Sequence, residues 1–329
     1  MNLEPEAGTS IRRKRMQLKA PRSHDGLPLG RAGVVVWALL VVAGTGFAQN
    51  APGPPTDAAA VVRRAVASRM AMDAAHHPVR FVLHKQDDRR NVTQEIIETP
   101  QGDVALLVGV NGNALSANGR AAERARLENL DANPDLQEHR HRREQDDADR
   151  VTNLLKLLPD AFVYHYDSTV ACDVTTQPVV VVPGVAAPIA PGTGEASQCY
   201  HMTFTPKPDW DPPNLEAKVL KGMAGEIWIE TGDERLCRLQ GRLIQDVDFG
   251  WGIVGRLDQG GTIDLEQTRI GDKDWELTRM KLNFTGRALM VKTLSYKINE
   301  EMGEYERVPA GTDYHRAIKV LEAGQPGGP

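Results

Sequence analysis

The feature that most constrains the fold is a run of short segments in residues 225–298 in which apolar and polar residues alternate. The first segment, residues 225–230, ends at a turn at residues 231–234, and the alternation resumes at Arg235. Alternation with a period of two is typical of a strand with one face on the core and the other in water. Consecutive strands joined by tight turns pair antiparallel, because a parallel pair needs a crossover of a dozen or more residues. This part of the chain therefore predicts an antiparallel meander.

The later strands of the meander change face. Trp275 and Leu277 point to one side of the expected sheet, whereas Leu282 and Phe284 point to the other. One explanation is a β-bulge that switches the faces within a strand. The other is a sheet that is apolar on both sides, with one side covered by helices or by a ligand. The sequence leaves both explanations open.

The residues before the meander predict a mixture of helices and strands. Residues 57–75 can form a helix capped by Thr56 or Asp57, and residues 215–223 a short one. The remaining apolar segments are bounded by turn residues and predict strands. These expected strands are residues 79–85, 91–98, 103–110, 161–166 and 198–205.

Residues 116–158 predict a helical insertion, of which residues 116–150 are dense in charge. Asn133 followed by Pro134 favours a helix start, since asparagine caps helices and proline suits their first turn. Pro159 is expected to end this helix. A packed face is predicted by the i, i+3, i+4, i+7 spacing of Val151, Leu154, Leu155 and Leu158.

The other boundaries follow from composition. Residues 49–56 are a Pro/Gly/Ala linker, and residues 178–196 are Pro, Gly, Ala and Val without periodicity, which predicts a surface insertion. One α+β domain is expected over residues 57–310, followed by a C-terminal tail over residues 311–329.

The first 48 residues read as an export signal. A basic lead precedes the apolar core of residues 33–43, and Gly46-Phe47-Ala48 offers the small-x-small pattern of a cleavage site after Ala48. The apolar core is well below the ~20 residues that a permanent membrane helix needs. A cleaved signal and a periplasmic location are therefore expected, with an uncleaved anchor as the alternative.

Charge excludes one class of partner. Removing the seven basic and three acidic residues of residues 1–48 from totals of 39 and 44 leaves 32 and 41, a net charge of −9. A chain this acidic is a poor ligand for nucleic acid, whose binding depends on neutralising phosphates.

The chain has three cysteines. Cys172 and Cys199 flank the Pro/Gly-rich insertion and could form a disulfide in an exported protein. Cys237 is expected to be a small core residue. Three thiols without further Cys or His ligands at metal-binding spacing do not indicate a zinc site, and no metal site is expected.

The sequence contains no complete catalytic or cofactor-binding motif. Residues 250–255 match G-x-G-x-x-G, but a further strand is expected after them where a nucleotide site needs a helix. His76-His77 and His139-x-His141 are expected to be a helix end and a solvated charged face. Asp246 and Asp248 fall on the polar side of a strand, where hydrated or ion-paired acids are usual. The sequence therefore predicts a non-enzymatic protein without a cofactor or a nucleotide.

One segment carries a family resemblance. Residues 225–230 consist of a glycine, a free position, an aliphatic residue, a tryptophan, an aliphatic residue and an acid, and an acidic turn with a returning basic strand follows. With the export signal and the long meander, this layout resembles the LolA/LolB and RseB/MucB group of periplasmic lipoprotein-sorting-like proteins. The resemblance implies a half-barrel, which is one curved antiparallel sheet with helices covering its concave side.

The resemblance also implies a function. Members of the group carry lipoprotein acyl chains or sense envelope lipids, so the expected partner is a lipid or an acylated protein. The alternative is an envelope protein-interaction or assembly module without a lipid ligand. We take seven apolar residues of the meander as candidates for lining the concavity: Ile227, Trp228, Trp251, Trp275, Leu282, Phe284 and Leu294.

Overall fold

The computed structural model describes residues 53–75, 77–172, 197–249, 255–270, 274–288 and 292–324. The export signal, His76, Trp251 and the insertion at residues 178–196 lie outside these ranges. Within them, no helix has both the length and the apolar character needed to span a bilayer.

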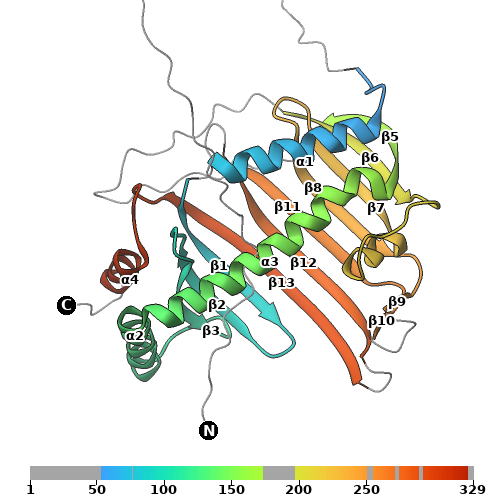
Figure 1. Cartoon of the computed structure of the whole chain (residues 1–329). Coiled ribbons are helices and arrows are strands. Elements are labelled where there is room, and N and C mark those ends of the chain that lie inside the picture. The colour runs from blue at the N-terminus through green and yellow to red at the C-terminus, as the bar shows by residue number, and fades with distance from the viewer. Residues whose placement is uncertain are drawn as a thin grey trace, which may run out of the picture.

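Thirteen strands of the described chain form one sheet, and every pairing in it is antiparallel. The expected α+β architecture with one large antiparallel sheet is confirmed (Figure 1). The strand order is β4-β3-β2-β1-β13-β12-β11-β8-β7-β6-β5, with β9 and β10 attached beside β12. The strands are β1 (Val79–Asp87), β2 (Asn91–Ile97), β3 (Val104–Val110), β4 (Asn113–Ala114), β5 (Phe162–Ala171), β6 (Gln198–Pro206), β7 (Met223–Glu230), β8 (Arg235–Leu243), β9 (Val247–Phe249), β10 (Gly255–Leu257), β11 (Thr262–Ile270), β12 (Asp274–Ala288) and β13 (Lys292–Arg307).

Two helices cross one face of the sheet. Helices α1 (Ala58–Ala75) and α3 (Pro134–Ala161) lie side by side across the strands in Figure 1. Buried side chains from both helices, including Val61 and Leu158, pack against the strand residues Met202 and Ile227. We call the side of the sheet that carries Ile227 the α1/α3 face.

The other two α-helices pack on the opposite face, near β2 and β3. Helices α2 (Ala117–Ala132) and α4 (Tyr314–Ala323) share a buried cluster with Ile97. Ile96, its neighbour on β2, instead packs with Phe81 of β1. The pairing register from Phe81 along β1 and across the sheet to Ile227 puts Ile96 on the α1/α3 face. Since neighbouring residues of a strand point to opposite faces, α2 and α4, which pack on Ile97, lie on the other face.

The helical insertion forms as predicted, with one difference at its end. Ser116 caps α2 by accepting a hydrogen bond from the backbone N–H of Gly119 (3.1 Å), and α3 begins at Pro134 directly after Asn133. Pro159 was expected to end α3, but the helix continues to Ala161. The burial of Pro159 and Ala161 against the core offsets the one helical hydrogen bond that a proline removes.

The prediction of a C-terminal tail from residue 311 was wrong. Asp313 caps α4 by accepting a hydrogen bond from the backbone N–H of Arg316 (2.8 Å). The buried residues of α4 have the i, i+3, i+4, i+7 spacing of a packed helix. They are Tyr314, Ala317, Ile318 and Leu321.

A bulge accounts for the change of face in β12. Glu266 of β11 pairs with Arg279, whereas the next residue, Gln267, pairs with Leu277, so Thr278 is an extra residue on β12. The first of the two explanations left open by the sequence therefore holds for this strand.

Cys172 and Cys199 form a disulfide, as the sequence allowed. The bond closes a loop with a sequence separation of 27 residues.

Loop-closure entropy for that length predicts that reduction of the Cys172–Cys199 bond lowers the free energy of unfolding by about 3.5 kcal/mol. Urea unfolding with and without a dithiol reductant measures the difference. A Cys172→Ser variant, which cannot form this bond, should show no response to the reductant, and an equal response would contradict the assignment.

Candidate apolar binding face

Four of the seven candidate residues belong to one continuous row of side chains on the α1/α3 face. Ile227 lies opposite Leu239, and the row continues through Leu265 to Met280 of β12. Leu282 and Phe284 follow Met280 at steps of two, so they point to the same side.

Two residues of β13 extend this row of apolar side chains. Tyr296 lies opposite Phe284, and Leu294 lies opposite Gly286. Leu294 was among the candidates, whereas Tyr296 was not.

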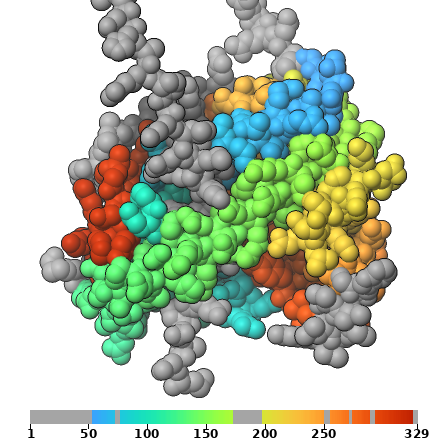
Figure 2. All heavy atoms as spheres, viewed as in Figure 1, coloured from blue at the N-terminus to red at the C-terminus, as the bar shows by residue number. Residues whose placement is uncertain are grey.

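Burial divides the α1/α3 face into a covered and an open part. Ile227 is only 2% exposed beneath the helices. Leu282 and Phe284 are half-buried, and Leu294 and Tyr296 are 38% and 48% exposed. The ends of β12 and β13 extend beyond α3 in Figure 1, and orange-red atoms of these last strands reach the surface beside α3 in Figure 2. We call Leu257, Leu282, Phe284, Leu294 and Tyr296 the open apolar patch.

Two glycines shape this patch. A Cβ on Gly286 would lie 2.1 Å from the carbonyl oxygen of Arg256, so only glycine lets β10 pair so closely with β12. A Cβ on Gly261 would lie 2.5 Å from the ring of Phe284. Glycines therefore bring Leu257 of β10 next to β12 and let the Phe284 ring lie against the backbone.

The apolar residues of β13 end at a buried ion pair. Glu300 lies opposite Met280 on one side and Lys85 of β1 on the other, so all three share the α1/α3 face. Lys85 Nζ lies 2.7 Å from Glu300 Oε1, and both side chains are only 6% exposed. Burial raises the pKa of Tyr296, and the negative charges of Glu300 and of Asp147 on α3 add to this rise.

The remaining candidates lie elsewhere. Trp228 points to the opposite face, where it stacks on His201 (4.6 Å between ring centres) and carries the Arg238 guanidinium 5.5 Å from its ring. Trp275 is buried in a separate cluster with Cys199 and Cys237. Trp251 lies outside the described residues. Neither Trp228 nor Trp275 therefore joins the open apolar patch.

The carboxylates considered for acid–base chemistry have a structural role. Asp248 Oδ1 accepts a hydrogen bond from Arg256 Nε (2.7 Å), and Asp246 Oδ2 lies 3.2 Å from Arg256 Nη1. These ion pairs raise the pKa of Arg256. Asp246 and Asp248 therefore both pair with Arg256 of β10, next to the pairing of β9 with β10.

Sequence reasoning missed Tyr296, Lys85 and Glu300. The signal for Lys85 was present, since it occupies the next inward position after Phe81 and Leu83 of β1. A charge at an inward position indicates a buried partner. The partner lies more than 200 residues away on β13, and no local pattern identifies it.

Comparison of the chain with protein-family models, with curated proteins and with solved structures found no match. The resemblance to the lipoprotein-sorting-like group therefore stays a prediction.

Proposed function

We propose that the chain binds the acyl chain of a lipid or of an acylated protein on the open apolar patch, as a carrier or sensor of the bacterial cell envelope. The observation that carries this proposal is the exposure of Leu294 and Tyr296 on a face that is otherwise core. Large apolar residues that continue a core to the surface are typical of ligand sites. In this proposal the sheet is a half-barrel, and the α1/α3 face is its concave side.

An acyl ligand fits the chemistry of the patch. Each CH₂ group that leaves water contributes about 0.8 kcal/mol, so a chain of moderate length binds without specific polar contacts. The patch has one polar atom to offer, the Tyr296 hydroxyl, and the charges of Lys85 and Glu300 already satisfy each other. The proposal therefore involves binding and no bond making or breaking. The export signal expected at residues 1–48 gives the chain access to envelope lipids.

Native mass spectrometry tests this function. The chain is purified from a bacterial periplasm without detergent, and a co-purifying mass is identified by solvent extraction. We expect a lipid or acyl-chain mass, and we expect delipidated protein to take up a long-chain fatty acid. A clean apoprotein that takes up neither fatty acid nor acylated peptide would contradict the proposal.

A second candidate is a protein-interaction module of the envelope, and the opposite face favours it. A row of cross-strand neighbours there carries charged side chains, with Arg279 Nη2 at 2.6 Å from Glu266 Oε2. The row consists of His201, Trp228, Arg238, Glu266, Arg279, Glu301 and His84. Capture of an envelope protein that is lost on Arg279→Ala, with fatty-acid uptake absent in both forms, would favour this module.

A further inference from the structure

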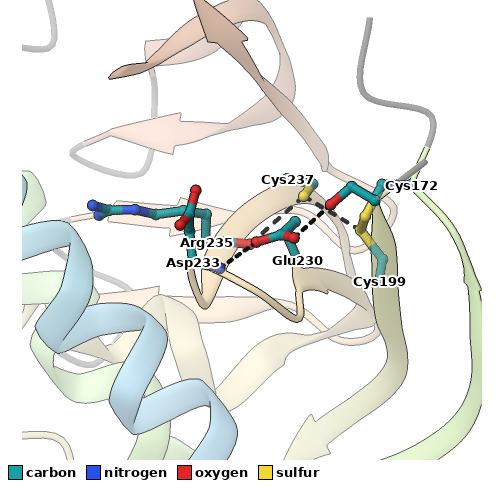
Figure 3. The surroundings of a disulfide bond; sticks show 7 residues. Cys172, Cys199, Glu230, Asp233, Arg235 and Cys237 are labelled. Carbon is teal, nitrogen blue, oxygen red and sulfur yellow. Dashed lines mark hydrogen bonds between the residues drawn. A yellow bond between two sulfur atoms is a disulfide. The ribbon is translucent and has the colours of Figure 1, made fainter. Parts of the chain in front are cut away.

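The fold brings the three cysteines together. Cys237 Sγ lies 3.4 Å from Cys199 Sγ, and the three sulfurs of Cys172, Cys199 and Cys237 all lie within 4.8 Å of one another (Figure 3). Cys172 directly follows β5, Cys199 lies on β6 and Cys237 on β8, and the disulfide joins only the first two. Cys237 is thus a buried free thiol against a disulfide.

A second disulfide does not explain the position of Cys237. Cys199 and Cys237 lie on β6 and β8, which β7 separates. Two strand spacings amount to about 9–10 Å, whereas a disulfide joins Cα atoms no more than about 7 Å apart. We call the three neighbouring sulfurs of Cys172, Cys199 and Cys237 the cysteine triangle.

We propose that the reduced chain binds one soft monovalent metal ion, Cu(I), through the sulfurs of Cys172, Cys199 and Cys237. A three-coordinate ion with metal–sulfur bonds of about 2.3 Å holds its sulfurs about 4 Å apart. Cys237 Sγ lies 3.4 Å from Cys199 Sγ and within 4.8 Å of Cys172 Sγ, and the bonded pair must move apart on reduction to reach this spacing. Thiolate ligands select soft ions such as Cu(I).

The number of donors distinguishes copper from zinc. A structural zinc site is closed by four protein ligands. Among the described residues, the three sulfurs are the whole group of His, Cys, Asp and Glu donors that meet at this point. The Glu230 carboxylate nearby accepts hydrogen bonds from Ser197 Oγ and from the backbone N–H of Asp233 instead.

The three sulfurs are packed among apolar side chains. Trp275 is buried in the same cluster, and Met72, Val170 and Trp228 pack against it, so the sulfurs lie in apolar surroundings. Burial raises the pKa of the Cys237 thiol to about 12, with Arg269 acting in the opposite direction.

The disulfide-bonded state and the Cu(I)-bound state exclude each other, because both use the sulfurs of Cys172 and Cys199. A dithiol reductant transfers two electrons and two protons to the Cys172–Cys199 bond and is itself oxidised to a disulfide. Cu(I) then replaces the thiol protons, which pass to water, and its own oxidation state does not change. The oxidised chain keeps the disulfide and offers one sulfur, so it should not retain the ion.

Competition with a chromophoric Cu(I) chelator tests the site under anaerobic conditions. We expect the reduced protein to take up one Cu(I) per chain, and the oxidised protein to take up none. Cys237→Ser, which leaves the disulfide pair intact, should weaken Cu(I) binding of the reduced protein by more than tenfold, because loss of a direct ligand exceeds the ~10–100-fold cost of losing an outer partner. Equal binding by this variant, or retention of Zn²⁺ but not Cu(I), would overturn the proposal.

A control in urea covers loss of structure on reduction. Circular dichroism reports whether the reduced chain and the Cys237→Ser variant are folded. The urea-unfolded chain has the same three thiols without the triangle, so it should bind Cu(I) more weakly than the folded reduced chain. Equal affinity of the unfolded chain would show that the fold does not build the site, and the proposal would fail.

Discussion

Replacing Lys85 with methionine is expected to lower the free energy of unfolding by about 3–5 kcal/mol. The change leaves the Glu300 carboxylate buried on the α1/α3 face without its cation, which lies 2.7 Å away in the native protein. A buried charge that loses its partner keeps its desolvation cost and loses the compensating attraction. Urea unfolding followed by circular dichroism measures the change.

Two further variants separate this cause from general damage. The double change Lys85→Met with Glu300→Leu removes both charges and should restore most of the lost stability or exceed that of the native protein. Arg142→Met breaks an exposed pair with Glu138 and should cost less than about 1 kcal/mol. A double variant as unstable as Lys85→Met would show that the shape of the lysine matters and that its charge does not.

Replacing Leu294 with aspartate is expected to weaken the binding of a fluorescent long-chain fatty acid at least tenfold. Full burial of a leucine side chain contributes about 1.5–3 kcal/mol, and tenfold in affinity corresponds to about 1.4 kcal/mol. The aspartate also loses hydration when an acyl chain covers it, which adds to the loss. Fluorescence titration of the delipidated protein measures the affinity.

The neighbouring residue supplies a matched control. Thr293 is exposed, and its pairing with Arg287 places it on the opposite face of β13. Thr293→Asp adds the same charge one residue away and should leave fatty-acid binding unchanged. Since Leu294 is already 38% exposed, its variant should stay folded. Equal loss in both variants would indicate an effect of net charge and would contradict the proposed patch.

Much of the sheet could be predicted from local patterns. The expected strands at residues 91–98 and 198–205 differ from β2 and β6 by one residue at the C-terminal end. Alternation and turn residues are local, so they identify strands in the absence of tertiary information. The helix α4 was missed because its packed positions are half small or polar-tipped, namely Ala317 and Tyr314.

The candidate site was only partly predictable, because its members are related by register. Ile227 and Trp228 are adjacent apolar residues, and alternation alone cannot say which of them faces the helices. Pairing with Leu239 and Arg238 decides it, since each residue shares the face of its cross-strand partner. The cysteine triangle escaped prediction for the same reason: Cys199 and Cys237 meet across β7, and the sequence does not specify which strands flank which.

The pairing of β1 with β13 determines when the sheet can be completed. Among the described residues these are the first and last strands, and they are neighbours in the interior of the sheet. Contacts between residues more than 200 positions apart form late, because the long intervening chain must first lose its conformational freedom. Refolding of the sheet should therefore be slow. Until β13 is in place, β1 and β12 each present an unpaired edge to other chains, so a nascent chain that stops before residue 292 is prone to aggregation.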